Sequence, residues 1–241
     1  MTAAEERRGD PISAVAALDE PTRRGLYDYV VRQPGPVSRD EAAAALKLPR
    51  TTAAFHLDRL VDEELLDVVY QRRTGHTGPG AGRPAKLYHR SRCDIVVSLP
   101  ERRYDLAGQL LSTALEQAER SGNSPRAVLD QHAYQVGKEL GETARVAAGE
   151  EDNRDTALHV LEAYGFEPRI EGGSVALVNC PFHTLAQEHT ELVCGMNLRL
   201  LDGLLDGLAP TGMTSHLHPT PAHCCVRLEP ASSGKDQAGG N

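Results

Sequence analysis

The sequence predicts an α+β fold that is mostly α, in three successive parts: residues 11–92, 93–150 and 151–230. Apolar residues recur at helical spacing near the N-terminus, and two β-prone runs flank a glycine- and proline-rich segment, TGHTGPGAGRPA. Helical and strand-like segments then alternate towards the C-terminus. A chain of 241 residues, 40% of them apolar, is long enough for one large domain or two modest ones.

The first part begins with two expected helices. Apolar residues at helical spacing predict a helix over Pro11–Gln33, which Pro21 can bend. The segment QPGP then breaks the helical pattern. A second helix is expected from Ser38, because a serine followed three residues later by Glu41 is a capping-box pattern. Residues 1–10 are expected to be a flexible N-terminus.

A third helix and a hairpin complete the first part. PRTTAAFHLDRLVDEELL places apolar residues on one expected buried face, formed by Ala53, Leu57 and Leu60. LLDVVYQRR and KLYHRS then read as two strands. Three helices followed by a hairpin is the order of a winged helix-turn-helix, so residues 11–92 are predicted to be a DNA-binding domain.

The start of the third helix suits the major groove of DNA. Small or polar residues there let the backbone approach base edges, and longer side chains supply hydrogen-bond donors. The candidate DNA contacts in this helix are Arg50, Thr51, Thr52, His56 and Arg59. A polar face that is merely solvated is the alternative interpretation.

The charge distribution favours DNA at the same end of the chain. The net charge is −8, but residues 1–92 carry +2 and residues 93–241 carry −10. Between Gln71 and Arg92 there are six Lys and Arg residues and no acidic residue. Such a basic wing favours a polyanion, and Arg83 between glycine and proline suits an A·T-rich minor groove. The candidate contacts in the wing are Arg72, Arg73, Arg83 and Lys86.

Residues 93–150 are expected to form central helices. From Leu99 to Gly149 the chain reads as helical, with an apolar stripe formed by Tyr104, Ala107, Leu111 and Leu115, and Leu110 beside it. The stripe either faces the core of the same chain or pairs two copies as a homodimer. The third part, residues 151–230, is expected to be a small α+β sensor domain, followed by a disordered tail at residues 231–241.

Five cysteines need an explanation in this chain. No window approaches eighteen uninterrupted apolar residues, so no membrane span is expected. The N-terminus lacks the apolar core of a secretory signal, and we therefore expect a cytoplasmic location. In that reducing compartment an odd number of cysteines favours metal or redox chemistry over a disulfide framework.

Three of these cysteines are candidates for one metal site. If the last strand alternates, Cys224 shares the inward face with Val226 and Leu228, while Cys225 lies on the other face. The candidate ligands are then Cys180, Cys194 and Cys224. A non-cysteine fourth ligand is expected from the nearby histidines, His183 and His223 above all. Spacing alone leaves a zinc site and inert buried thiols as alternatives.

Two cysteine-bearing segments give a resemblance to a known family. With PRTTAAFHLDRLVDEELL and GRPAKLY upstream, NCPFHTLAQEHTELVCGMNLRLLDGLL and CCVRL resemble the SufR-type repressors of iron-sulfur cluster biogenesis, of the actinobacterial helix-turn-helix branch (ArsR/DeoR-like). The resemblance implies a homodimeric repressor that binds double-stranded operator DNA and holds a [4Fe-4S] cluster through three cysteines. Two of them fall on Cys180 and Cys194. The doublet leaves the third open between Cys224 and Cys225, and the strand alternation favours Cys224.

Two other functions compete with this one. A zinc- or other metal-responsive or redox-responsive regulator would use the same cysteines. An enzyme would use Cys180 as a nucleophile and His183 as a base, but nothing in the sequence supplies an orienting carboxylate or an oxyanion hole. The sequence therefore favours a regulator over an enzyme, and Cys93 is expected to be an ordinary structural thiol.

Overall fold

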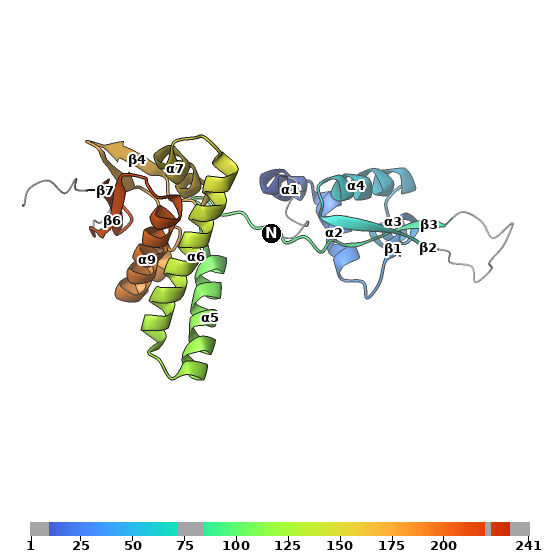
Figure 1. The fold of residues 1–241 in the computed structure, drawn as a ribbon. Helices are drawn as coiled ribbons and strands as arrows, with labels where there is room; N and C mark the ends of the chain where they lie inside the picture. Colours follow the sequence, from blue (N-terminus) through green and yellow to red (C-terminus); the bar gives the residue numbers. More distant parts are fainter. Residues whose placement is uncertain (1–9, 72–83, 220–222, 232–241) are drawn as a thin grey trace, which may run out of the picture. The chain divides into compact units, whose positions relative to one another are not determined.

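The computed structural model describes residues 10–71, 84–219 and 223–231, and its chain is mixed α and β with helix predominating. Two compact units divide the chain, Met1–Val97 and Ser98–Asn241. Figure 1 colours the first unit from blue to green and the second from green to red. Each unit has its own hydrophobic core.

Four helices form most of the first unit. They are α1 (Pro11–Ala17), α2 (Pro21–Val31), α3 (Arg39–Leu46) and α4 (Arg50–Asp62). The single helix predicted over Pro11–Gln33 is therefore wrong, because the chain breaks at residues 18–20. Glu20 caps α2 by accepting a 3.0 Å hydrogen bond from the backbone N–H of Thr22, and Pro21 takes the first helical position, which favours proline. Pro21 thus starts a helix instead of bending one.

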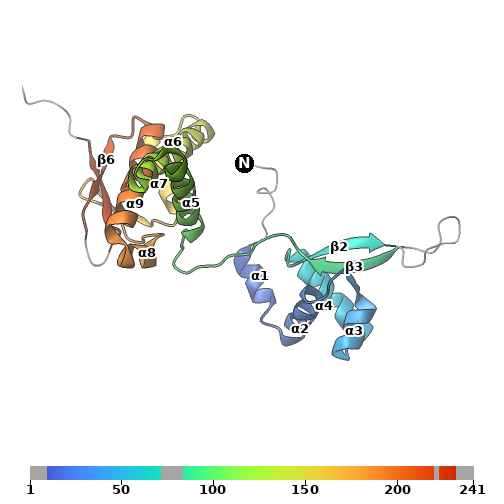
Figure 2. The same ribbon diagram turned by 90° about the horizontal axis from the view of Figure 1, so that it is seen from below.

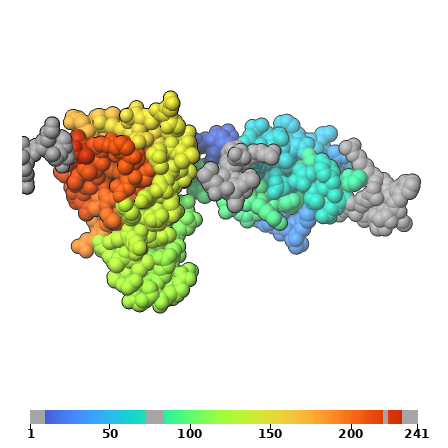
Figure 3. All heavy atoms as spheres, in the orientation of Figure 1, coloured from blue at the N-terminus to red at the C-terminus, as the bar shows by residue number. Residues whose placement is uncertain are grey.

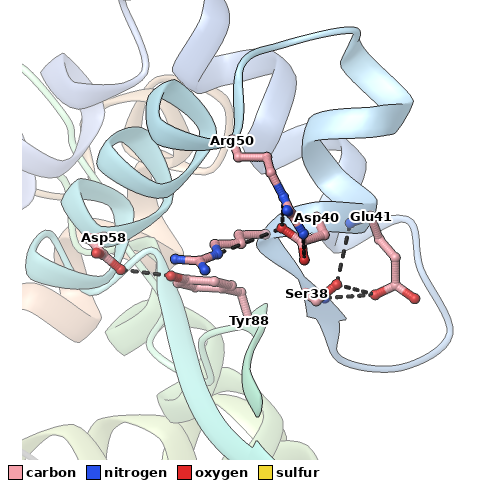
Figure 4. A network of polar contacts seen from close by, with 7 residues as sticks. Ser38, Asp40, Glu41, Arg50, Asp58 and Tyr88 are labelled. Carbon is pink, nitrogen blue, oxygen red and sulfur yellow. Dashed lines mark hydrogen bonds and ion pairs between the residues drawn. The ribbon is translucent and has the colours of Figure 1, made fainter. Parts of the chain in front are cut away.

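The capping box predicted at the start of the second expected helix is confirmed. The backbone N–H of Glu41 donates to Ser38 Oγ at 3.3 Å, and the backbone N–H of Ser38 donates to Glu41 Oε2 at 2.8 Å. Figure 4 shows this reciprocal pair. Two N–H groups at the helix start are satisfied in this way, which fixes where α3 begins.

A three-stranded antiparallel sheet completes the first unit. It has the order β1-β3-β2, with β1 (Val37–Ser38), β2 (Leu66–Gln71) and β3 (Ala85–Arg90). Figure 2 shows the helices on one face of the β2–β3 hairpin. The predicted buried face of α4 is confirmed, since its three apolar residues are fully buried: Ala53, Leu57 and Leu60.

The second unit places helices on a four-stranded antiparallel sheet (Figures 1 and 2). The helices are α5 (Tyr104–Ser121), α6 (Pro125–Ala148), α7 (Asn153–Ala163), α8 (His183–Glu188) and α9 (Thr190–Leu208). The sheet has the order β4-β5-β7-β6, with β4 (Pro168–Glu171), β5 (Ser174–Leu177), β6 (Met213–Leu217) and β7 (Val226–Pro230). Helices and strands from residues 93–150 and 151–230 share one core. Figure 3 shows the loop end of the α5–α6 hairpin protruding from this unit. No helix in the described part of the chain is long and apolar enough to cross a membrane.

The apolar stripe predicted on the central helix is only partly buried. The residues of α5 that face the core are Ala107, Leu110, Ala114 and Ala118. Tyr104 and Leu115 are instead 40% and 56% exposed. The buried stripe is rotated relative to the predicted one because small alanines, rather than the larger side chains, allow α5 to approach α6.

Glycines bring α6 and α9 into backbone contact. A Cβ atom added at Gly137 of α6 would lie 1.9 Å from the carbonyl oxygen of Leu200. A Cβ atom at Gly203 of α9 would lie 2.0 Å from the carbonyl oxygen of Tyr134. Both distances are far below van der Waals contact, and Gly141 and Gly207 continue the same contact one turn along each helix. Only glycine permits this approach.

We expect Gly137→Ala to destabilise the second unit by about 3 kcal/mol, because the added methyl group would overlap backbone atoms that have no rotamer to change. The matched control is Gly108→Ala on α5, where no atom lies within 4 Å of the added Cβ. That change should stabilise by about 0.5–1 kcal/mol through helix propensity. Urea unfolding followed by far-ultraviolet circular dichroism measures both, and equal stability of the two variants would contradict the close contact.

Candidate functional site

The outer face of α4 carries most of the side chains predicted to contact DNA. Arg50, Thr51 and Arg59 are exposed, and Thr52 is half-buried. His56 is placed differently: its side chain is only 13% exposed, and its Nδ1 lies 3.6 Å from Glu20 Oε2 on α2. This buried nitrogen has no hydrogen-bond partner among the described residues, and a DNA contact through His56 stays a prediction.

Arg50 is held at the start of α4 by an acidic residue of α3. Its guanidinium makes two hydrogen bonds to the Asp40 carboxylate, one of them from Nε at 2.6 Å (Figure 4). These bonds hold the pKa of Asp40 below its usual range and raise that of Arg50. The pair joins the two helices of the helix-turn-helix, and it keeps a cation beside the N-terminus of α4.

A second carboxylate on α4 binds the wing strand. Asp58 Oδ1 accepts hydrogen bonds from Lys86 Nζ at 2.6 Å and from the Tyr88 hydroxyl at 2.7 Å, the latter drawn in Figure 4. Burial opposes ionisation of Asp58, but the two donors outweigh it and lower its pKa. Burial and the bond to Asp58 raise the pKa of Tyr88. Lys86 of β3, predicted to contact DNA, is thus paired with a carboxylate of α4. The remaining wing candidates lie outside the described residues: Arg72, Arg73 and Arg83.

Four of the five cysteines meet at one end of the second unit. Cys180 follows β5, Cys194 lies in the first turns of α9, and Cys224 and Cys225 directly precede β7. The sulfurs form two pairs. Cys194 and Cys225 are joined by a disulfide with a Cα–Cα separation of 6.3 Å, and the buried thiols of Cys180 and Cys224 are hydrogen-bonded to each other. Cys93 is exposed and lies in the first unit.

The inward orientation predicted for Cys224 agrees with its 3% exposure, and Val226 and Leu228 are buried on the same face. The expectation that Cys225 points away is wrong, because its sulfur is bonded to Cys194. Cys225 lies in a bend before β7 begins, where strand alternation does not apply. Both residues of the doublet therefore reach the cysteine cluster, which we define as Cys180, Cys194, Cys224 and Cys225.

Two asparagines support the cysteine cluster. Asn197 lies one turn after Cys194 on α9 and is 1% exposed. Its Nδ2 donates to Cys224 Sγ at 3.2 Å, and its buried Oδ1 has no hydrogen-bond partner. Asn179 fixes the other side by donating to the carbonyl of Glu101 at 3.0 Å. The hydrogen bond between the paired thiols lowers the pKa of Cys180 and raises that of Cys224, which is also buried.

The chemistry of this donor set fits a soft metal or an iron-sulfur group. Two pairs of sulfurs and an orphaned buried amide oxygen lie on neighbouring elements, and thiolates are the ligands that such groups prefer. In the described residues no three His, Cys, Asp or Glu side chains are already arranged to hold a metal ion. The two predicted fourth ligands, His183 and His223, are both exposed. The metal-ligand assignment of Cys180, Cys194 and Cys224 therefore stays a prediction.

Sequence reasoning missed several residues of both sites. Asp58 and Tyr88 lie thirty positions apart in the sequence. They meet only because the folded chain places β3 near α4. Asn197 could have been found, since a polar residue at helical spacing from Cys194 interrupts the apolar run of α9. Phe55 could have been found as well, because it falls opposite Ala53 and Leu57 on the expected helix.

We expect Asp58→Ala to destabilise the first unit by about 1–2 kcal/mol, because the buried Tyr88 hydroxyl loses its acceptor. The effect should be smaller in a Tyr88→Phe background, and Asp62→Ala, an exposed carboxylate on the same helix, is the matched control. Because the pKa of Asp58 is lowered by folding, the difference should be constant above about pH 5 and shrink as the pH falls below about 4, without vanishing, since a protonated carboxyl still accepts from the Tyr88 hydroxyl. Urea unfolding across this range tests both points, and additive effects of the two substitutions would contradict the contact.

Comparison with known proteins identifies the first unit. Residues 18–69 match the family described as a helix-turn-helix domain. No curated protein and no solved structure matches the chain. The matched segment runs from the end of α1 into β2 and includes all of α3 and α4. The chain thus carries a helix-turn-helix domain, which indicates a DNA-binding transcription regulator rather than an enzyme.

Proposed function

We propose that the protein is a homodimeric repressor of iron-sulfur cluster assembly genes that senses its own [4Fe-4S] cluster through Cys180, Cys194 and Cys224. The observation that carries the proposal is the cysteine cluster in a chain whose other unit holds a helix-turn-helix domain. Bound there, an iron-sulfur cluster would supply a group that oxidants can break, which suits a sensor.

The disulfide gives the proposal a specific condition. Cys194 can serve as a thiolate ligand only after its bond to Cys225 is reduced. Cys180 and Cys224 already lie side by side as thiols. Two of the proposed ligands are thus free thiols, and the third is held in a form that a thiol reductant releases.

A homodimer is part of the same proposal. Regulators of this kind read paired half-sites about 34 Å apart, which requires two recognition helices. The exposed side of α5 offers two apolar side chains for a contact with a second copy, Tyr104 at 40% exposed and Leu115 at 56%. Exposed apolar residues in one stripe favour association over solvation.

A zinc-dependent regulator is the second candidate, and the fourth cysteine favours it. With both Cys224 and Cys225 reaching the cysteine cluster, four thiolates could bind zinc tetrahedrally without any histidine. The colour of protein purified without oxygen separates the two candidates, because zinc proteins are colourless and [4Fe-4S] proteins are brown.

Arg50→Ala should weaken DNA binding and lower the slope of log K against log salt by about one unit, because one phosphate contact is lost. Arg50 begins α4, the second helix of the helix-turn-helix and its recognition helix, and the Arg50 side chain is 70% exposed. Arg169→Ala, an exposed arginine of the second unit, is the matched control and should leave the slope unchanged. Titrations of duplex DNA at several salt concentrations measure the slope; an unchanged slope for Arg50→Ala would remove α4 from the interface.

The cysteine variants test the ligand set. Single serine substitutions at Cys180, Cys194 or Cys224 should each give colourless protein that folds but has lost tight operator binding, because a hydroxyl is a poor ligand for iron. Cys93→Ser should stay brown. Wild-type protein purified aerobically should need a thiol reductant before it takes up iron and sulfide, whereas Cys225→Ser should not, since its Cys194 is free.

Iron and sulfide counted per subunit after anaerobic reconstitution, together with absorption spectra, give the result. Brown protein from each of the three ligand variants would end the three-cysteine proposal. A colourless Cys225→Ser with a brown Cys224→Ser would exchange the roles of the doublet. Wild-type protein that stays colourless and loses DNA binding to a chelator would favour zinc.

A further inference from the structure

Phe55 is a large apolar side chain turned to solvent in the middle of the recognition helix. It is 67% exposed, whereas the residues on the core side of α4 are fully buried: Ala53, Leu57 and Leu60. At about 100° per residue, Phe55 lies about 190° from the centre of that buried stripe. The side chain therefore adds almost nothing to the core of its unit, and water is a poor environment for it.

The neighbours of Phe55 on α4 are polar and suited to DNA. Thr51 precedes it by four residues and Arg59 follows it by four, so the three side chains line one outward stripe. Asp58 also lies on this side, but its carboxylate is occupied by Lys86 and Tyr88. Asp62, the other carboxylate, is nearly two turns further on, away from the helix start that enters a groove.

We propose that Phe55 contacts the C5-methyl group of a thymine in the major groove and so selects for thymine at one position of each half-site. Base edges in the major groove present hydrogen-bonding groups and a single apolar group, the thymine methyl. A benzyl side chain has no hydrogen bonds to offer, so this methyl group is the feature that it recognises. The inference rests on the DNA-binding function proposed above and specifies what the recognition helix reads.

The test begins with the full-length protein and a library of duplex DNA with a random core. If the wild-type protein selects no sequence from this library, the proposed DNA-binding function fails, whatever Phe55 does. With the selected site in hand, each thymine is replaced singly by uracil, which removes only the methyl group. At one thymine per half-site the wild-type protein should lose about fourfold in affinity, the value for burial of one methyl group.

Phe55→Ala should bind the thymine site more weakly than wild type by a similar or larger factor, and it should lose nothing further when that thymine becomes uracil. Phe55→Leu should keep part of the uracil sensitivity. Ile170→Ala removes an equally exposed apolar side chain, 63% exposed, from the second unit, and it should behave as wild type. Circular dichroism checks that each variant is folded, which we expect because both substituted side chains are exposed.

Three results would overturn the inference while leaving DNA binding intact. One is a Phe55→Ala variant that is as sensitive to uracil as wild type at each thymine. Another is a selected site with no uracil-sensitive thymine. The third is loss of the dimer on Phe55→Ala, measured by sedimentation, with unchanged uracil sensitivity, which would assign Phe55 to a contact with a second copy of the chain.

Discussion

The second unit depends on the backbone contact between α6 and α9. Side chains normally keep helix axes 8–10 Å apart, and glycines on both helices remove that spacer here. Because α9 is held so closely, it is buried on most of its circumference. The start of the same helix carries Cys194 and Asn197. The contact that fixes α9 therefore also fixes one member of the cysteine cluster and one asparagine that supports it. If the proposed sensing function holds, so closely packed a helix would keep these side chains at set positions.

In the first unit, α4 serves two purposes through opposite faces. Its apolar stripe anchors the helix in the core, and its outward face leaves Thr51, Phe55 and Arg59 exposed. The cations around it are paired with carboxylates, Arg50 with Asp40 and Lys86 with Asp58. Exposed pairs of this kind stabilise a protein little. Under the proposed function, DNA phosphates would replace the carboxylates at small cost, while the pairs keep the cations in place before binding.

Local patterns in the sequence predicted the parts of the fold that local physics determines. The capping box at Ser38 and the buried stripe of α4 need only neighbouring residues, and both are confirmed. The rotation of the buried stripe on α5 depends on how closely α6 approaches, and the spacing of apolar residues in the sequence does not reveal that distance. The sheet of the second unit also needs a pairing between distant segments, since Val175 of β5 lies opposite Leu228 of β7.

The cysteine doublet shows the same limit at the site itself. Cys224 is buried as predicted, but Cys225 is not turned away, because both residues precede β7 and alternation does not govern them. The difference changes the chemistry: a cysteine on the outer face would not touch Cys194, whereas Cys225 is bonded to it. Under the proposed function, oxidation of these two thiols and loss of the iron-sulfur cluster would reinforce each other, since each removes Cys194 from the ligand set. Under that proposal, a single bend before a strand would make the site respond to thiol oxidation as well as to its bound group.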